Sequence, residues 1–468
     1  MDHREQSVVL VIFGITGDLA QRKLLPALYR LVQSDQMPRH FRIIGITRRT
    51  VERDAVYARL QEFSADPSFD AAIQRFLVEH TEMLQMALTE SSAYRQLYRR
   101  LKEIEDSMSS PIVRLYYLAI PPQIFAPIVR LLGETGHAAP LPGVEDSSRL
   151  LVEKPFGYDM TSARELIGIL DKSFAEHQIY RIDHYLARET AQNILTFRFG
   201  NSLFESAWDN RSIAGITVAA RETIGVEGRG QFYEDVGALR DIIQSHLLHL
   251  LAITTMAEPA RLASDEIHAE KLKLFGSIRS IPANRVDQLA QRGQYIGYRK
   301  EVGNPKSRTE TFARVRLEID NEQWRGVPIV LETGKALAEK LTEIVVRFAR
   351  RGDLQTRENR LIFRIQPDEA ITVYLHVKHP GLDSRTEMTA MGFQYKDAFK
   401  LRHPEPYERV LTDAMKGDRT LFAAAFEVIE SWRIVQNVVE EWAKSGATLE
   451  YYERGSHGPT DPEIVENQ

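Results

Sequence analysis

The first third of the chain alternates continuous apolar runs with stretches of helical periodicity, and this alternation limits the folds open to it. Residues 8–13 form one apolar run, and residues 41–46, 113–120 and 150–152 form others, with helical stretches between them. A strand that is apolar on both sides needs helices on both faces of its sheet, as in parallel α/β sheets. We therefore predict a doubly covered parallel sheet over residues 1–180.

The pattern changes after about residue 180. Two long helical stretches, 241–256 and 422–443, interrupt a series of strands that often follow one another without a helix. Strands joined in this way indicate an antiparallel sheet. We predict a larger α+β domain over residues 181–468, with a loose polar tail from about residue 455. The predicted strands are 212–220, 312–319, 329–333, 343–349, 360–365 and 370–376.

Composition narrows the functional class. A chain of 468 residues is too long for one ordinary core, and a hydrophobic content of 43% is that of a soluble globular protein. The net charge of -5 argues against a generally nucleic-acid-binding surface, and no apolar run approaches the roughly 20 residues of a membrane span. The absence of cysteine excludes disulfides and thiolate chemistry. The simplest interpretation is a cytoplasmic enzyme that binds neither nucleic acid nor membrane.

The first strand is followed by a candidate cofactor turn. Gly14 comes directly after the strand and Gly17 just before a helix, in the pattern G-x-x-G-x-x-A. Glycines let the backbone approach a pyrophosphate while the amides of the helix start point at it, although a plain turn is the alternative. Arg48 and Arg49 follow the second strand, and no acidic residue lies between positions 41 and 51. An arginine there suits a 2′-phosphate, so a Rossmann-like domain that binds NADP rather than NAD is predicted, with solvated loop charges as the alternative.

A second group of residues suits the oxidation of a hydroxyl group. Lys154 ends an apolar strand, where open α/β sheets bind ligands, although such lysines are also common on surfaces. Asp183, His184 and Tyr185 are consecutive, and in an extended segment Asp183 and Tyr185 would face one way and His184 the other. His246 lies on the first long helix of the second domain. Removing a hydride from a hydroxyl carbon needs a base for the hydroxyl proton, and a histidine oriented by a carboxylate can supply it.

Cations elsewhere could hold a phosphate group. Lys335 follows a strand, and Lys340 is expected one helical turn later. Together with His184 and Arg188 they could bind a doubly charged phosphate, although two solvated lysines are equally plausible from the sequence. His249, one turn beyond the candidate base, is expected to be a packed or surface histidine.

These motifs resemble those of the glucose-6-phosphate dehydrogenase family over nearly the whole chain. The runs E-K-P-F-G at 153–157 and R-I-D-H-Y-L at 181–186 are highly specific for that family. The other matching motifs are G-x-x-G-D-L-A at 14–20, the block from E-G-R-G to H-L-L within 227–248, T-G-K-A-L at 333–337, and Y-E-R with D-A-x-x-G-D within 407–418.

The resemblance implies a reaction and an architecture. The reaction would be oxidation of D-glucose 6-phosphate at C1 to 6-phospho-D-glucono-1,5-lactone, with hydride transfer to NADP and no metal. This is the first step of the oxidative pentose phosphate pathway. The second domain would bind substrate, and its sheet would form a homodimer or a dimer of dimers.

The resemblance also implies a role for each site residue. His246 would be the general base and Asp183 its carboxylate partner, and Pro155 would often follow a cis bond. Substrate would be bound by Lys154, His184, Tyr185, Arg188, Glu222, Asp241, Lys335 and Lys340. The cofactor would be bound by Gly14, Thr16, Gly17, Asp18, Leu19, Arg48 and Lys154.

Several positions depart from the family pattern. Ala187-Arg188 replaces Gly-Lys, Phe125 stands where a tyrosine often contacts the cofactor, and Glu332 replaces an arginine. Arg188 and Glu332 motivate a first alternative, a dehydrogenase for another hexose phosphate or for the free sugar. A second alternative is a nucleotide-sugar sensor on an inactive scaffold. Retention of both His246 and Asp183 counts against a sensor, which needs no base.

Overall fold

A computed structural model describes residues 6–108, 112–141, 144, 146–350, 358–399, 402, 404–444, 446 and 448–460. The chain divides into two compact units, which are described separately. The first consists of Met1–Gly157, Thr161–Ala187 and Pro404–Ala425. The second consists of Tyr158–Met160, Arg188–His403 and Phe426–Gln468. A single boundary near residue 180 was expected from the sequence. In the structure, Pro404–Ala425 also belongs to the first unit, which a single boundary cannot describe.

The first unit contains a six-stranded, fully parallel sheet in the order β3-β2-β1-β4-β5-β6. This confirms the Rossmann-like α/β prediction, and the four apolar runs correspond to β1, β2, β4 and β5. β3 and β6 were not predicted, because their sequences T-E-M-L-Q and I-Y-R are short and carry polar residues. The strands are β1 (Ser7–Phe13), β2 (Phe41–Thr47), β3 (Thr81–Gln85), β4 (Ile112–Leu118), β5 (Ser148–Val152) and β6 (Ile179–Arg181).

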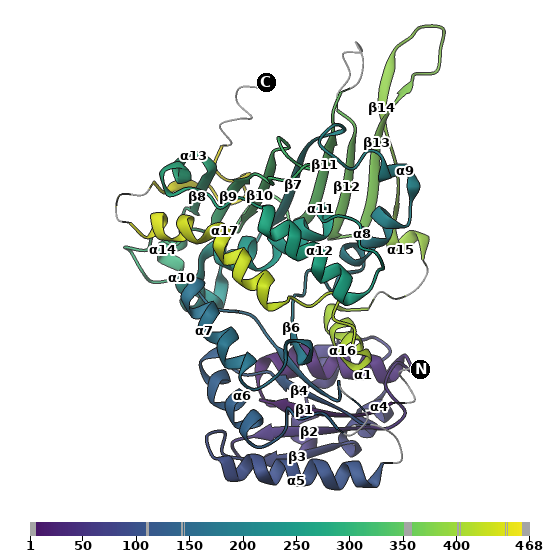
Figure 1. The fold of residues 1–468 in the computed structure, drawn as a ribbon, viewed down its shortest axis with the longest axis vertical. Coiled ribbons are helices and arrows are strands. Elements are labelled where there is room, and N and C mark those ends of the chain that lie inside the picture. The colour runs from purple at the N-terminus through teal and green to yellow at the C-terminus, as the bar shows by residue number, and fades with distance from the viewer. Residues whose placement is uncertain are drawn as a thin grey trace. The chain divides into compact units, whose positions relative to one another are not determined.

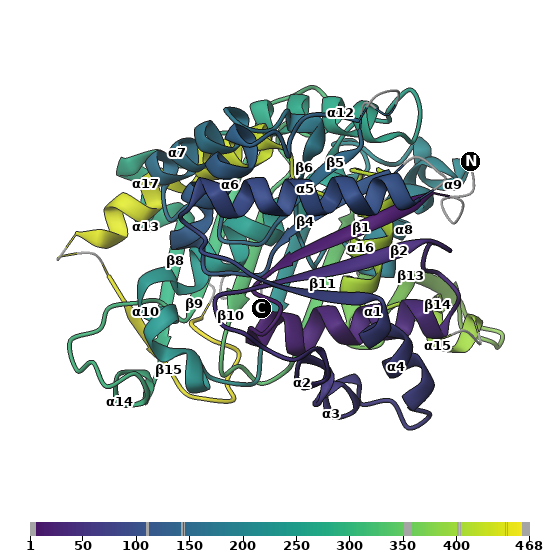
Figure 2. The ribbon, with the colours of Figure 1, turned by 90° about the horizontal axis from the view of Figure 1, so that it is seen from below.

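Two separate cores cover the two faces of this sheet. Successive residues of β1 alternate between them, since side chains alternate along a strand. One core includes helices α1, α4 and α16, and the other includes α5 and α6. Figures 1 and 2 show α1 and α5 on opposite sides of the strands. The helices of this unit are η2 (Ala20–Leu24), α1 (Leu25–Gln33), α2 (Arg53–Tyr57), α3 (Leu60–Ser64), α4 (Ala71–Glu79), α5 (Ser91–Ser107), η3 (Pro122–Ile124), α6 (Phe125–Glu134), α7 (Met160–Asp171), η4 (Glu176–Gln178) and α16 (Pro406–Lys416).

The second unit contains a nine-stranded sheet in the order β14-β13-β12-β11-β7-β10-β9-β8-β15. Only the pairs β7–β10 and β8–β15 are parallel in this sheet as described, so the prediction of a mainly antiparallel α+β domain is confirmed. The strands are β7 (Ile213–Arg221), β8 (Ala290–Tyr295), β9 (Phe312–Leu317), β10 (Ile329–Gly334), β11 (Leu341–Phe348), β12 (Arg360–Gln366), β13 (Ala370–Lys378), β14 (Thr386–Gln394) and β15 (Glu450–Tyr452).

The helices α8, α11, α12 and α17 lie on the same face of this sheet (Figure 1). Burial alternates accordingly, because Ile216 and Val218 of β7 are fully buried whereas Thr217 between them is half-exposed. The helices are α8 (Glu189–Phe199), α9 (Ser202–Glu205), η5 (Glu227–Arg229), α10 (Gly230–Ala238), η6 (Leu239–Leu247), α11 (Leu248–Thr255), α12 (Ser264–Ser277), η7 (Ala283–Arg285), α13 (Val286–Leu289), α14 (Tyr298–Glu301), α15 (Tyr395–Ala398) and α17 (Ala425–Ala443). None of the helices in the described part of the chain has the length and apolar character needed to cross a bilayer.

The predicted loose tail is wrong at its start. The Gly455 N–H donates to the Ala336 carbonyl at 2.7 Å, and the Ala338 N–H donates to the Ser456 carbonyl at 2.8 Å. These backbone bonds join the segment to the loop that follows β10. The rest of the predicted tail, after residue 460, lies outside the described residues.

A buried histidine in the first unit makes its stability depend on pH. The Nε2 of His137 lies 3.0 Å from the Tyr94 carbonyl, and its Nδ1 lies 3.0 Å from the Tyr116 hydroxyl. A carbonyl only accepts, so Nε2 carries the proton and Nδ1 accepts from Tyr116. Burial lowers the pKa of His137 to about 4, and the hydrogen bond to Tyr94 only partly offsets this.

The unfolded chain therefore binds the additional proton between about pH 6.5 and pH 4, whereas the native state does not, and stability falls as pH falls through this window. We expect the native chain to lose about 2 kcal/mol between pH 7 and pH 5 from this group. His137→Gln keeps a donor and an acceptor but cannot titrate. Urea unfolding at both pH values should show a smaller acid loss in the variant, and parallel losses would contradict the assignment.

Candidate active site

The first unit forms a tight turn where β1 ends, and the position requires glycine. Gly14 has a φ of 83°, a backbone conformation that residues with a side chain rarely adopt. A Cβ atom here would lie 2.5 Å from the backbone oxygen of Ala119, after β4. The Gly14 N–H donates to the Ile46 carbonyl at 3.2 Å, and the Gly17 N–H donates to the Gly14 carbonyl at 2.8 Å. The turn thus lies at the carboxyl ends of β1, β2 and β4, where sheets of this order bind dinucleotides.

The other predicted cofactor residues lie on the surface around this turn. Thr16 is exposed and Leu19 is half-buried. Asp18 is also exposed and pairs with Arg22 at 2.5 Å, one turn along the helix. Arg48 follows β2 and is exposed. Its guanidinium is therefore accessible to a ligand beside the end of β2.

Glu153 is the centre of a hydrogen-bonded group at the end of β5. It accepts from the Tyr117 hydroxyl at 2.5 Å, and its other oxygen lies 3.2 Å from His184 Nε2. The His184 ring stacks on Tyr407, with ring centroids 4.4 Å apart. Burial alone would raise the pKa of Glu153, but the His184 ring and the hydrogen bonds from His184 and Tyr117 outweigh it and lower the pKa. His184 is therefore held in one orientation by an ionised carboxylate and an aromatic ring.

Asp183 closes a turn instead of lying in an extended segment. Its Oδ1 accepts from the Tyr185 N–H at 2.8 Å and from the Leu186 N–H at 3.4 Å. Aspartate commonly binds the backbone amide two residues further on in this way. The alternation stated for an extended segment therefore does not apply to Asp183, His184 and Tyr185.

Two cationic side chains near these residues, Arg181 and Lys154, differ in how far they are exposed. Arg181 is buried and makes two hydrogen bonds to Glu176, at 2.8 and 3.0 Å, so its charge is used within the fold. Lys154 is half-buried, and the peptide bond between Lys154 and Pro155 is cis, as the family resemblance implies. Of the two, only Lys154 retains partly exposed surface for a ligand.

In the second unit, His246 is buried in the middle of a continuous helix. The helix begins as the π-helix η6 and continues as α11, so the predicted helix over 241–256 is confirmed with two extra residues at its start. At this start the Leu239 N–H donates to Glu310 Oε1 at 3.1 Å. Gly237, just before it, has a φ of 72° and would place a Cβ 2.3 Å from Glu310. Glu310 therefore caps the helix, and π-helical turns are frequent at functional sites.

The other end of this helix is held by buried side chains. Its carbonyls from residues 253 to 256 have no partners within the helix. Arg198 donates to the first and last of them at 2.9 and 2.7 Å. The indole groups of Trp208 and Trp324 donate to the two between, at 2.9 and 2.7 Å. Both ends of the His246 helix are thus fixed by side-chain hydrogen bonds.

Three of the predicted sugar-binding residues gather around Tyr233. The Lys335 ammonium forms an ion pair with Glu222 and lies 5.2 Å from the centre of the Tyr233 ring. Burial first, and then charges that include those of Asp241 and Glu222, raise the pKa of Tyr233 well above its ordinary value. The phenol therefore stays protonated among two carboxylates and an ammonium, which together can bind several hydroxyl groups.

Lys340 does not lie one helical turn after Lys335, so that expectation is wrong. Ala336 has a φ of 52°, and the Leu337 N–H donates to the Glu222 carbonyl at 2.9 Å. These features bend the segment after β10 away from a helix. Lys340 is exposed at the end of the bend.

Two departures from the family pattern have local explanations. Glu332 is buried, accepts from Arg314 at 2.7 and 2.9 Å, and pairs with Arg221 at 2.8 Å. It therefore neutralises two arginines within the sheet. Arg188 stands at the start of α8, half-exposed, with its Nη2 3.4 Å from Gln366 Oε1. The Glu332 departure thus concerns sheet packing and gives little support to a changed substrate.

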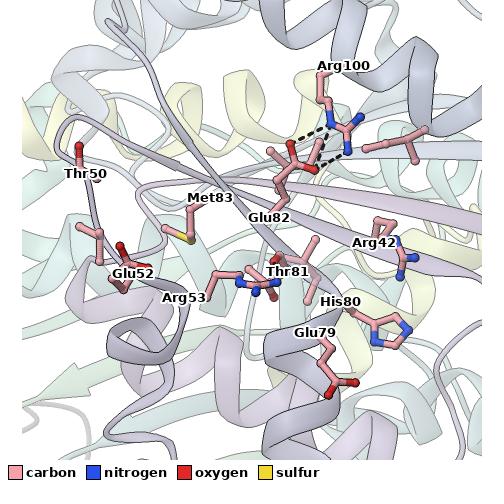
Figure 3. A pocket seen from close by; sticks show the side chains of 14 residues that line it. Arg42, Thr50, Glu52, Arg53, Glu79, His80, Thr81, Glu82, Met83 and Arg100 are labelled. Atoms are coloured by element: carbon pink, nitrogen blue, oxygen red, sulfur yellow. Dashed lines mark hydrogen bonds and ion pairs between the residues drawn. The ribbon is translucent and has the colours of Figure 1, made fainter.

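A pocket of about 470 Å³ lies along β3 in the first unit (Figure 3). None of the predicted site residues lines it. Its arginines Arg42, Arg53 and Arg100 are balanced by three glutamates, and Arg100 is already paired with Glu82 at 2.8 Å. The pocket therefore has little excess charge to attract a phosphate. Within the described ranges, no cluster of three or more histidine or acidic side chains is arranged to hold a metal ion.

Sequence reasoning missed four residues of these groups, namely Glu153, Tyr117, Tyr407 and Tyr233. Glu153 and Tyr407 lie inside the quoted motifs E-K-P-F-G and Y-E-R, and this membership could have marked them as candidates for the site. Tyr233 lies in the block between E-G-R-G and G-A-L-R-D. In the sequence, Tyr117 looks like any other buried strand residue. Only the pairing of β4 with β5 places it beside Glu153.

Comparison with protein families gives two matches that together cover nearly the whole chain. The model described as "Glucose-6-phosphate dehydrogenase, NAD binding domain" matches residues 11–193. The model described as "Glucose-6-phosphate dehydrogenase, C-terminal domain" matches residues 195–467.

Individual relatives match over similar lengths. Glucose-6-phosphate 1-dehydrogenase of Bacillus subtilis is 37% identical, over 98% of this chain and 96% of the relative. The enzyme of Chlamydia muridarum is 38% identical, over 96% and 93%. A solved glucose-6-phosphate dehydrogenase in complex with glucose 6-phosphate has a TM-score of 0.90 and 31% identity, over 99% of this chain and 97% of that one. The enzyme from Mycobacterium avium has a TM-score of 0.82 and 34% identity, over 97% and 96%.

The turn at Gly14 gives a prediction about the cofactor site. Gly14→Ala adds a Cβ against the Ala119 carbonyl in a left-handed conformation, which should destabilise the chain by roughly 1–3 kcal/mol. The displaced turn should also raise the Kd of the dinucleotide. Urea unfolding and a binding titration measure the two effects.

Gly168→Ala is the matched control. Gly168 lies in α7, and a Cβ there meets nothing within 4 Å. Alanine favours a helix over glycine, so this variant should gain roughly 0.5–1 kcal/mol and bind dinucleotide normally. If Gly14→Ala behaved like Gly168→Ala, the turn would not need glycine.

Proposed function

This chain belongs to the glucose-6-phosphate dehydrogenase family, and from that premise we propose how its residues carry out the reaction. The enzyme oxidises D-glucose 6-phosphate at C1 to 6-phospho-D-glucono-1,5-lactone, the first step of the oxidative pentose phosphate pathway. The observation that carries this conclusion is that the family match extends over both units. An assay of cofactor reduction with glucose 6-phosphate, glucose and other hexose phosphates tests it.

We infer that NADP is preferred over NAD. When bound, the cofactor supplies the hydride acceptor. Gly14 and Gly17 allow the backbone to approach the pyrophosphate, and Thr16, Asp18 and Leu19 belong to the same turn. The exposed Arg48 guanidinium would bind the 2′-phosphate, because a charged fork matches phosphate geometry.

His246 would act as the general base. Its burial on a helix fixed at both ends supports this role, since a base must be held at hydrogen-bonding distance from the proton that it removes. Asp183 as its carboxylate partner stays a prediction, because the two residues belong to different units.

The remaining residues would bind substrate. Glu222, Asp241, Lys335 and Lys340 would read the sugar hydroxyls and ring position, and the grouping of the first three around Tyr233 supports this. His184, Tyr185 and Arg188 would bind the phosphate, and Lys154 would touch both substrate and cofactor. The cytoplasmic location stays a prediction from composition.

Replacing His246 tests the base. Positioned general bases contribute about 10²–10⁴-fold, and His246→Asn keeps the size while removing the base. We expect kcat to fall by that factor with little change in the Kd of glucose 6-phosphate. His177→Asn, at an exposed position, is the control and should leave kcat unchanged. Near-normal turnover in His246→Asn would remove this residue from the mechanism.

Replacing Arg48 tests the choice of cofactor. A charge-assisted hydrogen bond to the 2′-phosphate is worth roughly 1.5–3 kcal/mol, or about 10–150-fold in affinity. Arg48→Ala should raise KM for NADP by about that factor and leave KM for NAD nearly unchanged. Steady-state kinetics with both cofactors measure this. Equal effects would mean that Arg48 does not bind the 2′-phosphate.

We also propose that the enzyme is a homodimer assembled through its large sheet. The face opposite the buried residues of β7 carries Thr217, Val345 and Ile362, which neighbour one another across β7, β11 and β12. All three are half-exposed. A second copy would bury this row, as symmetric oligomers do with a self-complementary face.

A charge in this row should break the dimer. Ile362→Glu places a charge in the row that a second copy would bury, and light scattering should then give the mass of one chain with an unchanged far-UV spectrum. Leu203→Glu on α9, where the leucine is already 84% exposed, is the control and should keep the native mass. A native protein with the mass of a single chain would contradict the proposal.

A further inference from the structure

A cluster of four buried ionisable residues lies beside the helix that carries His246. Glu427 on α17 accepts at both oxygens: His268 Nδ1 lies 2.9 Å from one, and His249 Nδ1 lies 3.0 Å from the other. Lys271 Nζ lies 2.6 Å from the second oxygen. Glu427 and Lys271 are fully buried. His249 is therefore packed, as one of the two sequence-based alternatives expected, but it is also bonded to a buried charge.

The protonation of this Glu427 cluster follows from its partners. Burial alone would raise the pKa of Glu427, but the Lys271 charge and the hydrogen bonds from His249 and His268 outweigh it and hold the pKa well below its ordinary value. An ionised carboxylate only accepts, so both histidines donate from Nδ1. The carboxylate is therefore held by two histidine donors and by an ion pair with the Lys271 ammonium.

Two hydrogen bonds join α17 to the His246 helix. Gln244 Nε2 donates to Ser431 Oγ at 2.8 Å, and His249 donates to Glu427. Glu427 and Ser431 are four residues apart, so they lie one above the other on α17. Gln244 and His249 lie on either side of His246 in the sequence. The two bonds therefore hold the helix along its side on both flanks of His246, in addition to the caps at its ends.

We propose that Glu427, acting through His249, is a positioning residue that fixes the His246 helix for proton removal. The fully buried Lys271 ammonium on α12 lies 2.6 Å from Glu427, so this ion pair anchors the carboxylate. The hydrogen bond from His249, three residues after His246, connects the helix to this carboxylate. This inference rests on the proposed role of His246 as the base.

Two histidine variants test the proposal against a merely structural role. His249→Leu breaks the bond to the His246 helix, whereas His268→Leu breaks a bond of similar length to the same carboxylate from a different helix. Both leave Glu427 paired with Lys271, and both should lower the melting temperature. Only His249→Leu should lower kcat, by about 10–100-fold, because a misplacement of about 1 Å can cost 10²-fold. KM for glucose 6-phosphate and for NADP should change little.

A conservative variant and a double-mutant cycle sharpen the test. His249→Gln restores a donor toward Glu427 and should recover most of kcat. In a His246→Asn background, His249→Leu should cause no further loss of kcat, because the base that it positions is gone. Should His249→Leu fail to fold, Ser431→Ala removes the second bond, together with a local bond from Ser431 Oγ to the Val428 carbonyl within α17. It should lower kcat less, again without changing KM.

The outcomes separate the two claims. Equal kcat values for His249→Leu and His268→Leu, or a full further loss in the His246→Asn background, would overturn the positioning role. Where His249→Leu cannot be measured, unchanged kcat in Ser431→Ala would overturn it. A normal kcat in His246→Asn would instead overturn the role of the base and the proposal that depends on it.

Discussion

Buried backbone carbonyls need hydrogen-bond donors, and this requirement fixes the position of the helix that carries His246 in the second unit. Nothing within a helix can satisfy its last four carbonyls. Arg198, Trp208 and Trp324 supply the donors at the end of α11, and Glu310 supplies the acceptor at the start of η6. Any shift of the helix that carries His246 would break these bonds and leave buried polar groups without partners. The same hydrogen bonds supply the fixed position that the proposed role of His246 as a base requires.

Buried carboxylates impose the same rule on side chains. An isolated charge is costly to bury, and two buried carboxylates of this chain each have several partners. In the first unit Glu153 has Tyr117 and His184, and in the second Glu427 has two histidines and a lysine. Each carboxylate orients the imidazole that it accepts from. The departure at Glu332 fits this pattern, since its charge satisfies two arginines of the sheet.

The family motifs encode backbone shape as much as chemistry. Within R-I-D-H-Y-L, Arg181 is bound to Glu176 and Asp183 closes a turn, so both have structural contacts independent of any ligand. Gly14 is required by the approach of the turn to β4. Part of what these motifs specify is therefore the local backbone of the fold.

The sequence by itself determined the two sheets, the cofactor turn and the family, because hydrophobic periodicity and glycine spacing are local properties. It could not reveal β3, β6, β8, β14 and β15, whose short or polar sequences become strands only beside a neighbour. It placed Lys340 one helical turn after Lys335, and the backbone hydrogen bonds of the folded chain form a bend there instead. Only tertiary structure decided that Glu427, far along the chain, pairs with His249. The reason is that such a contact depends on how distant helices pack, and no local pattern records it.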